Sequence, residues 1–199
     1  MAPTRRSDLG SAVLAVGAVA GSYLLVRSGL GDHLDRQAQA RVSAGRSRAV
    51  DQVVATVTDL GSVYGLAGIS GALAGAGHRR LATEVAASGA TAWIGAQAAK
   101  PLLERQRPYE RGDLPRLVAP PAGSSWPSGH AAVVAAIAGS VLPELPRRAR
   151  PALVAAALGV GLSRLHVGVH HLTDLVAGFG VGVLSSVVGR RVVARLMAR

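Results

Sequence analysis

The chain has 199 residues, of which 49% are hydrophobic, 17% are charged and only 3% are aromatic. Its long apolar runs exclude a disordered chain, and the lack of cysteine excludes disulfides, thiol nucleophiles and cysteine metal sites. The formal net charge is +11, and Lys100 is the sole lysine among 22 cationic residues.

The arginines lie in short clusters between apolar runs. A nucleic-acid-binding surface would instead show a basic stripe with aromatic residues to stack on bases. Multi-span membrane proteins place their arginines in the connections between spans. We therefore expect a membrane protein without a nucleic-acid partner. The clusters are Arg5-Arg6, Arg79-Arg80, Arg147-Arg148-Arg150 and Arg190-Arg191.

Six apolar runs predict six membrane-spanning helices. A span needs about 20 apolar residues, within a range of roughly 17–25. The fourth and fifth runs reach this length only if polar residues at their ends continue the helix. The sequence predicts one all-α domain over residues 1–199, an integral membrane bundle of six helices with a phosphate site at one membrane surface. The predicted spans are 9–26, 53–76, 81–99, 128–142, 151–165 and 172–188.

The first apolar run has an alternative interpretation as a secretory signal. Arg5-Arg6 precede it, Ala18-Val19-Ala20 resembles a cleavage site, and Thr4-Arg5-Arg6 is similar to a twin-arginine signal. We expect a retained span, because the later spans need this helix for packing.

Four pairs of glycines recur at four-residue spacing. In lipid, such pairs let helix backbones approach closely. In a chain with 25 glycines some pairs arise by chance, so the pattern only suggests where helices pack. The pairs are Gly17/Gly21, Gly61/Gly65, Gly71/Gly75 and Gly178/Gly182.

Three polar segments interrupt the apolar runs. The first, residues 27–52, is either an amphipathic helix on the membrane or a solvated connector. The second, residues 104–125, is rich in proline and charge, and the third spans residues 163–173. If the helices alternate in direction, the chemically capable residues at the ends of the runs face one side of the membrane. These residues are Lys100, Arg107, Ser128, His130, Arg164, His170 and Asp174.

Two residues suit nucleophilic catalysis. His170 and Asp174 are four residues apart, so on a helix they would share a face. The carboxylate would orient one ring nitrogen and leave the other free to attack. His130 is left as a general acid for the departing alcohol.

The remaining polar residues suit a phosphoryl group. Ser128 follows a proline and resembles a helix N-cap, beside backbone N–H groups that bind anions. Lys100, Arg107 and Arg164 would stabilise negative charge on the equatorial oxygens of the phosphoryl group. Glu104, Glu110 and Asp113 are scattered in one loop without metal-ligand spacing, so no metal site is expected.

Three motifs resemble those of the type 2 phosphatidic acid phosphatase (PAP2) superfamily. The first is KPLLERQRP at residues 100–108, the second is PSGH at 127–130, and the third is SRLHVGVHHLTD at 163–174. They occur in the family's order and with its internal spacing.

The resemblance implies a lipid phosphatase that works without a metal cofactor. His170 would form a phosphohistidine, Asp174 would orient it, and His130 would protonate the leaving group. The implied substrate is a phosphatidic acid-like lipid or a polyprenyl phosphate or diphosphate in the bilayer. The implied phosphate-binding residues are Lys100, Arg107, Ser128, Gly129 and Arg164.

Two alternatives to a lipid phosphatase exist. Vanadate-dependent haloperoxidases share these motifs. Those enzymes are soluble, however, and the six apolar runs of this chain argue against a soluble enzyme. The second alternative is a non-enzymatic membrane protein with a relic pocket. A relic would be expected to have lost at least one of the eight catalytic and phosphate-binding residues of the motifs.

The positive-inside rule predicts the orientation in the cell membrane. With the N-terminus in the cytoplasm, eleven cations, Arg199 among them, lie inside. Of the eleven outside, Lys100, Arg107 and Arg164 belong to the pocket, which leaves eight for comparison. We therefore expect the pocket to face away from the cytoplasm.

Overall fold

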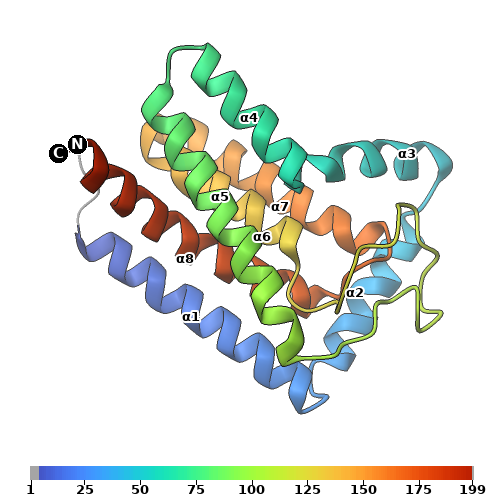
Figure 1. Ribbon diagram of the computed structural model, residues 1–199. Helices are drawn as coiled ribbons and strands as arrows, with labels where there is room; N and C mark the ends of the chain where they lie inside the picture. The colour runs from blue at the N-terminus through green and yellow to red at the C-terminus, as the bar shows by residue number, and fades with distance from the viewer. Residues whose placement is uncertain (1–4, 199) are drawn as a thin grey trace.

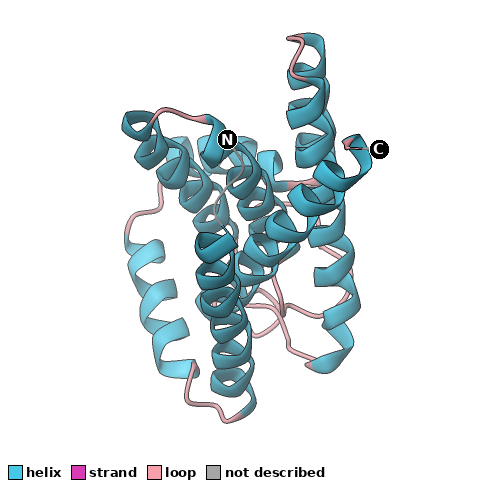
Figure 2. Cartoon of the chain, turned by 90° about the vertical axis from the view of Figure 1, so that its left-hand side faces the viewer, coloured by secondary structure: helices cyan, strands magenta, loops and turns pink. Residues whose placement is uncertain are grey.

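The computed structural model describes residues 5–198, and within this range the chain is entirely helical, without strands (Figures 1 and 2). Thr4 and Arg199, on which expectations about export and orientation partly depended, lie outside it. Four short 3₁₀ segments connect the helices. The eight α-helices of the described chain are α1 (Arg5–Arg27), α2 (Asp32–Ala44), α3 (Arg48–Val57), α4 (Val63–Gly75), α5 (Arg79–Ala99), α6 (Gly129–Val141), α7 (Arg150–His166) and α8 (Leu172–Met197).

The all-α prediction is confirmed, and five of the six apolar runs correspond to single helices, namely α1, α5, α6, α7 and α8. By length and composition, α1 and α8 can each cross a membrane, and the bent pair α3–α4 provides a third candidate. Only 11% of the apolar part of α1 is buried, against 61% for α8. Helix α8 is therefore a central element, packed against α1, α5 and α6.

The second run, residues 53–76, is not one continuous helix. A 3₁₀ segment, Thr58–Gly61, separates α3 from α4, and the two parts are bent by 67°. Ser62 starts α4 as its N-cap, because its hydroxyl accepts a hydrogen bond from the Gly65 N–H (3.1 Å). At the break, a Cβ on Gly61 would come within 3.0 Å of the His130 carbonyl oxygen. The bend thus brings this backbone against the start of α6.

The glycine pair Gly178/Gly182 allows α8 to pack closely against α6. A Cβ added to Gly178 or Gly182 would collide with the backbone of α6. The close approach predicted from their spacing is therefore real at this interface. By contrast, a Cβ added at either member of the pairs Gly17/Gly21 and Gly71/Gly75 would meet nothing within 4 Å. These two pairs therefore mediate no close helix contact.

The polar segment after α1 contains the helix α2, which packs on the bundle and is therefore more than a solvated connector. In α2, Asp35 and Gln39 are buried, at 2% and 5% exposure. Ala38 and Val42 of the same helix pack on a cluster that contains Leu165 and Leu175. Helix α2 thus lies against the ends of α7 and α8, and its buried face includes polar side chains.

The motif-bearing ends of four helices meet at one end of the bundle. The C-terminal ends of α5 and α7 and the N-terminal ends of α6 and α8 lie there, together with the long connection between α5 and α6 (Figure 1). The arginine clusters at the start of α5, around the start of α7 and late in α8 lie at the opposite end. The alternating helix directions that the sequence suggested therefore hold for these four helices.

Candidate active site

A cavity of about 240 Å³ lies at the motif-bearing end of the bundle. Ser128 and Asp174 do not line it, but both are fully buried. Segments from α4, α5, α6, α7 and the loops before α6 and α8 build its wall. The structure brings six of the eight predicted site residues to this cavity: Lys100, Arg107, Gly129, His130, Arg164 and His170.

His170 lies in the loop just before α8, so the expectation that it shares a helix face with Asp174 was wrong. Its Nε2 is 3.5 Å from Nη1 of Arg107. Its Nδ1 is 3.6 Å from Oδ2 of Asp174, slightly beyond hydrogen-bond length, and has no other partner in the described chain. Burial, reinforced by the charges of Arg107 and Arg164 and opposed by Asp174, lowers the pKa of His170 to about 3. The ring is therefore neutral at physiological pH, with Nε2 toward a cation.

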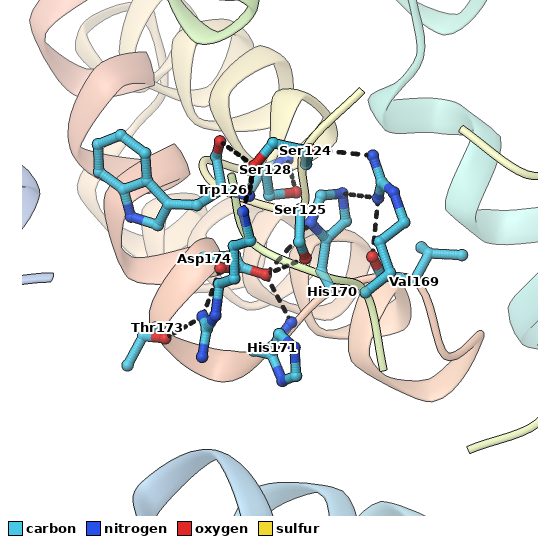
Figure 3. A network of polar contacts seen from close by, with 12 residues as sticks. Ser124, Ser125, Trp126, Ser128, Val169, His170, His171, Thr173 and Asp174 are labelled. Atoms are coloured by element: carbon cyan, nitrogen blue, oxygen red, sulfur yellow. Dashed lines mark hydrogen bonds and ion pairs between the residues drawn. The ribbon is translucent and has the colours of Figure 1, made fainter. Parts of the chain in front are cut away.

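Asp174 is held by three donors other than His170 (Figure 3). Its carboxylate accepts from Nη1 of Arg105 (2.6 Å) and from the Ser125 hydroxyl (2.5 Å). It also accepts from the backbone N–H of His171 (2.8 Å), as an N3 carboxylate does in a capping box. The start of α8 thus fixes the carboxylate beside His170.

Two cations of the first motif surround the loop that precedes the second motif. Lys100 follows α5 directly, and its Nζ donates to the carbonyl oxygen of Ser124 (2.5 Å). Burial, and then the charge of Arg107, lower the pKa of Lys100 to about 8. The guanidinium of Arg107 donates to carbonyl oxygens of Val169 (2.8 Å) and Gly123 (3.1 Å). Backbone carbonyls therefore orient both cations.

Arg164 completes the cationic wall from the last turn of α7. It is 2% exposed, and its Nη1 donates to the hydroxyl of Thr58 (2.9 Å), at the bend between α3 and α4. The Nε atoms of Arg164 and Arg107 are buried and have no hydrogen-bond partner in the described chain. Buried donors of this kind are available to an anion.

Ser128 starts α6 as the sequence predicted. Its hydroxyl accepts from the Ala131 N–H (3.4 Å). Its own N–H donates to the carbonyl oxygen of Asp174 (3.1 Å). Gly129 and His130 follow in the first turn, where backbone N–H groups have no partner within the helix, and both line the cavity.

Sequence reasoning missed Arg105, Ser125, Thr58 and Asp35. Arg105 lies inside the first motif segment, two positions before Arg107, and Ser125 lies two positions before Pro127 of the second motif. Their proximity to the motif residues was the available signal. No motif marked Thr58 and Asp35, because their contacts come from segments distant in sequence.

Two aromatic neighbours of the motifs face away from the cavity. Trp126 is 1% exposed, its indole N–H donates to the Ser22 hydroxyl of α1 (3.0 Å), and its ring packs edge-on against Tyr23. His171 accepts from the Gln39 amide at Nδ1 (2.9 Å), so its Nε2–H donates to the Gln106 carbonyl (3.1 Å). Both side chains anchor the site loops to the bundle.

Comparison with known proteins agrees with this architecture. The crystal structure of a transmembrane PAP2-type phosphatidylglycerolphosphate phosphatase from Bacillus subtilis is similar, with a TM-score of 0.76, 23% identity, and coverage of 94% of this chain and 96% of that one. LpxE from Aquifex aeolicus is also similar, with a TM-score of 0.71, 19% identity, and coverage of 79% and 95%. No protein of curated function matches the sequence significantly.

The family model described as the PAP2 superfamily matches residues 80–198, which include all three motifs and the helices α5 to α8. The match covers more than half of the chain, and the structural neighbours share the membrane fold over nearly their whole lengths. The protein therefore belongs to the PAP2 superfamily, a family of phosphatases.

Proposed function

We propose that the protein hydrolyses a phosphomonoester or diphosphate of a membrane lipid through a phosphohistidine on His170, without a metal cofactor. The observation that supports this most directly is the position of the neutral His170 Nε2, 3.5 Å from the Arg107 guanidinium in a cavity shared with Lys100, His130 and Arg164. A nucleophile beside cations is the arrangement that phosphoryl transfer requires.

In the first step, Nε2 of His170 attacks phosphorus, and the bond from phosphorus to the lipid oxygen breaks. Lys100, Arg107 and Arg164 stabilise the charge on the equatorial oxygens. His130 donates a proton to the departing oxygen, so the lipid leaves as an alcohol or, from a diphosphate, as a monophosphate.

In the second step, water attacks the phosphohistidine. His130, now without its proton, accepts one from the water, and inorganic phosphate leaves as the bond from phosphorus to Nε2 breaks. Asp174 keeps the ring oriented through both steps and favours the positive charge that develops on it.

The cavity wall favours a lipid as the substrate. Tyr64 of α4 and Trp93 of α5 both line it and are 85% and 40% exposed. Exposed aromatic side chains on apolar helices suit the boundary between hydrocarbon and head groups. An acyl or prenyl chain would lie between these helices in the bilayer, with its phosphate in the cavity.

The arrangement of arginines supports a multi-pass protein of the cell membrane whose cavity faces away from the cytoplasm. The clusters at the start of α5, around the start of α7 and late in α8 lie at the end opposite the cavity. Positive residues favour the cytoplasmic side.

Phosphate release from a panel of lipid phosphates and diphosphates in detergent, with and without a strong chelator, tests the proposal. Turnover should survive chelation and be inhibited by vanadate. Acid-labile phosphate trapped during turnover should map to His170 by mass spectrometry, be absent in His170→Ala, and remain in the control His33→Ala, which changes an exposed histidine. Activity lost on chelation and restored by magnesium, or phosphate on His130 or Ser128, would overturn the mechanism.

A further inference from the structure

Arg105 joins two buried carboxylates at the edge of the site. Its side chain is 7% exposed, and the side chains of Asp35 and Asp174 are 3% and 0% exposed. Nη1 of Arg105 lies 2.6 Å from Asp174 and Nη2 lies 2.5 Å from Asp35. The guanidinium therefore forms ion pairs in two directions, one toward the third motif and one toward α2.

Asp35 is in turn fixed to the start of α8. Its carboxylate accepts from the backbone N–H of Thr173 (2.9 Å) and from the Thr173 hydroxyl (2.9 Å). The same hydroxyl accepts from Nη1 of Arg105 (2.7 Å). The closed set of Asp35, Arg105, Thr173 and Asp174 thus links α2, the first motif and α8.

Arg105 is not placed to bind the phosphate. It does not line the cavity that contains His170, and both of its terminal nitrogens are occupied by carboxylates. The attractions of Asp174 and Asp35 outweigh its burial and raise the pKa of Arg105, so it remains charged. Its charge is therefore directed at Asp174 and not at the substrate.

We infer that Arg105 is a positioning residue that holds Asp174 in its orientation toward His170, and that Asp35 of α2 is the second positioning residue, acting through Arg105. The inference rests on the proposed role of His170. Without the guanidinium, the Asp174 carboxylate would keep only the Ser125 hydroxyl and the His171 N–H as donors. It would no longer be fixed along the direction of His170, and attack on phosphorus would slow.

The predicted signature is a separation of kcat from KM. Lys100, Arg107 and Arg164 bind the phosphate in the proposed mechanism, and Arg105 lies outside the cavity that they line. Loss of the ion pair between Arg105 and Asp174 should therefore lower both kcat and the rate of phosphohistidine formation. The KM should stay within about twofold of the value for the unaltered protein. Partners that orient metal-ligating side chains contribute roughly 10–100-fold to activity, and we expect a loss of kcat of that order here.

The test uses Asp35→Asn, Arg105→Gln, the double variant and Arg105→Lys in full-length protein in detergent. Asp35→Asn keeps the shape of the side chain but removes its charge. If Asp35 acts through Arg105, the double variant should be no slower than Arg105→Gln alone. Arg105→Lys should restore part of kcat, because an ammonium can pair with Asp174 but cannot reach both carboxylates with a planar fork.

Arg111→Gln is the matched control, because Arg111 is an exposed arginine of the same loop, 3.7 Å from Asp113. Rates are divided by the amount of folded protein that elutes as a single species in size-exclusion chromatography, so that a smaller folded fraction does not count as slower chemistry. If Arg105→Gln fails to fold, Asp35→Asn and Arg105→Lys decide the question.

Additive losses in the double variant, a raised KM at unchanged kcat, or Asp35→Asn rates equal to those of Arg111→Gln would overturn the inference. These outcomes are distinct from failure of the proposed function, in which the unaltered protein itself would form no phosphohistidine.

Discussion

The backbone N–H of Ser128 donates to the backbone carbonyl oxygen of Asp174 over 3.1 Å, which joins the second and third motifs through their main chains. Gly178, one turn further along α8, makes this approach possible, because a Cβ there would press on the Ser128 carbonyl and on Ala131. The relative position of the two motifs thus depends on the packing of α6 against α8 as well as on side chains.

This packing predicts the effect of adding a methyl group at the α6–α8 contact. Gly182→Ala would place a Cβ against the Ala132 carbonyl oxygen and Ala135, and overpacking of this kind costs about 1–3 kcal/mol. We expect a lower midpoint of thermal unfolding in detergent. The matched control, Gly71→Ala, meets nothing within 4 Å and should be neutral or gain up to about 1 kcal/mol from helix propensity. Equal midpoints for the two variants would contradict the close contact.

The role of His130 can be separated from that of His170 by the choice of leaving group. His130→Ala should slow hydrolysis of an alkyl phosphate by roughly 10²–10⁴-fold, because the departing alkoxide then lacks a general acid. The loss should be much smaller for p-nitrophenyl phosphate, whose leaving group needs little protonation. Initial rates with both substrates provide the measurement. An equal loss for both would mean that His130 does not act as the acid.

The lowered pKa of Lys100 predicts that activity falls at alkaline pH. The pKa of Lys100 is lowered to about 8 by burial and then by Arg107, so the ammonium binds phosphate below that pH and loses its charge above it. The value of kcat/KM, which reports on the free enzyme, should therefore fall as the pH rises through about 8.

Replacement of this lysine by arginine tests the same prediction. Lys100→Arg should remove the fall near pH 8, since a guanidinium stays charged. It should also lower activity by roughly 10²-fold, the effect of misplacing a reacting group by about 1 Å, because the fork is larger and planar. Near-normal turnover, or an unchanged alkaline limb, would show that the lysine is not required.

The two ends of the bundle should differ in their access to a membrane-impermeant thiol reagent. The sequence has no cysteine, so single replacements report one position each. Arg111→Cys lies at the cavity end and Arg148→Cys at the opposite end, and both sites are exposed. In intact cells only the Arg111→Cys protein should be labelled, and the reverse pattern would refute the orientation.

The exposed aromatic side chains at the cavity mouth predict a dependence on chain length. Trp93→Ala should raise KM for a long-chain lipid phosphate, because the indole is 40% exposed on the proposed path of the apolar chain. For a short, water-soluble phosphate ester KM should change less than twofold. Mixed-micelle assays with both substrates measure the difference, and equal changes would place the chain elsewhere.

The helical class and the grouping of most motif residues around one cavity were predictable from the sequence. Apolar runs of span length encode helices, since a backbone in lipid must satisfy its own hydrogen bonds. The proline and serine before Gly129 gave the start of α6, because the capping preference of serine is a local property. The motif residues lie within short segments, so their grouping needed only the alternating helix directions.

Other features depended on contacts between segments that are distant in the sequence. The bend at Thr58–Gly61 divides an apolar run that looks continuous, and it places Thr58 against Arg164. His170 reaches Asp174 through a loop and a helix cap, whereas spacing alone suggested a shared helix face.

Helix α2 illustrates the limit of sequence patterns most clearly. Its sequence is polar enough for a solvated connector, yet Asp35 and Gln39 are buried because Arg105, Thr173 and His171 supply their hydrogen-bond partners. The pattern of apolar residues predicts which side chains are shielded from water, and local motifs predict which atoms can react. Whether a polar side chain is buried depends on partners that only the folded chain brings within hydrogen-bond distance, because an unpaired buried polar group is costly.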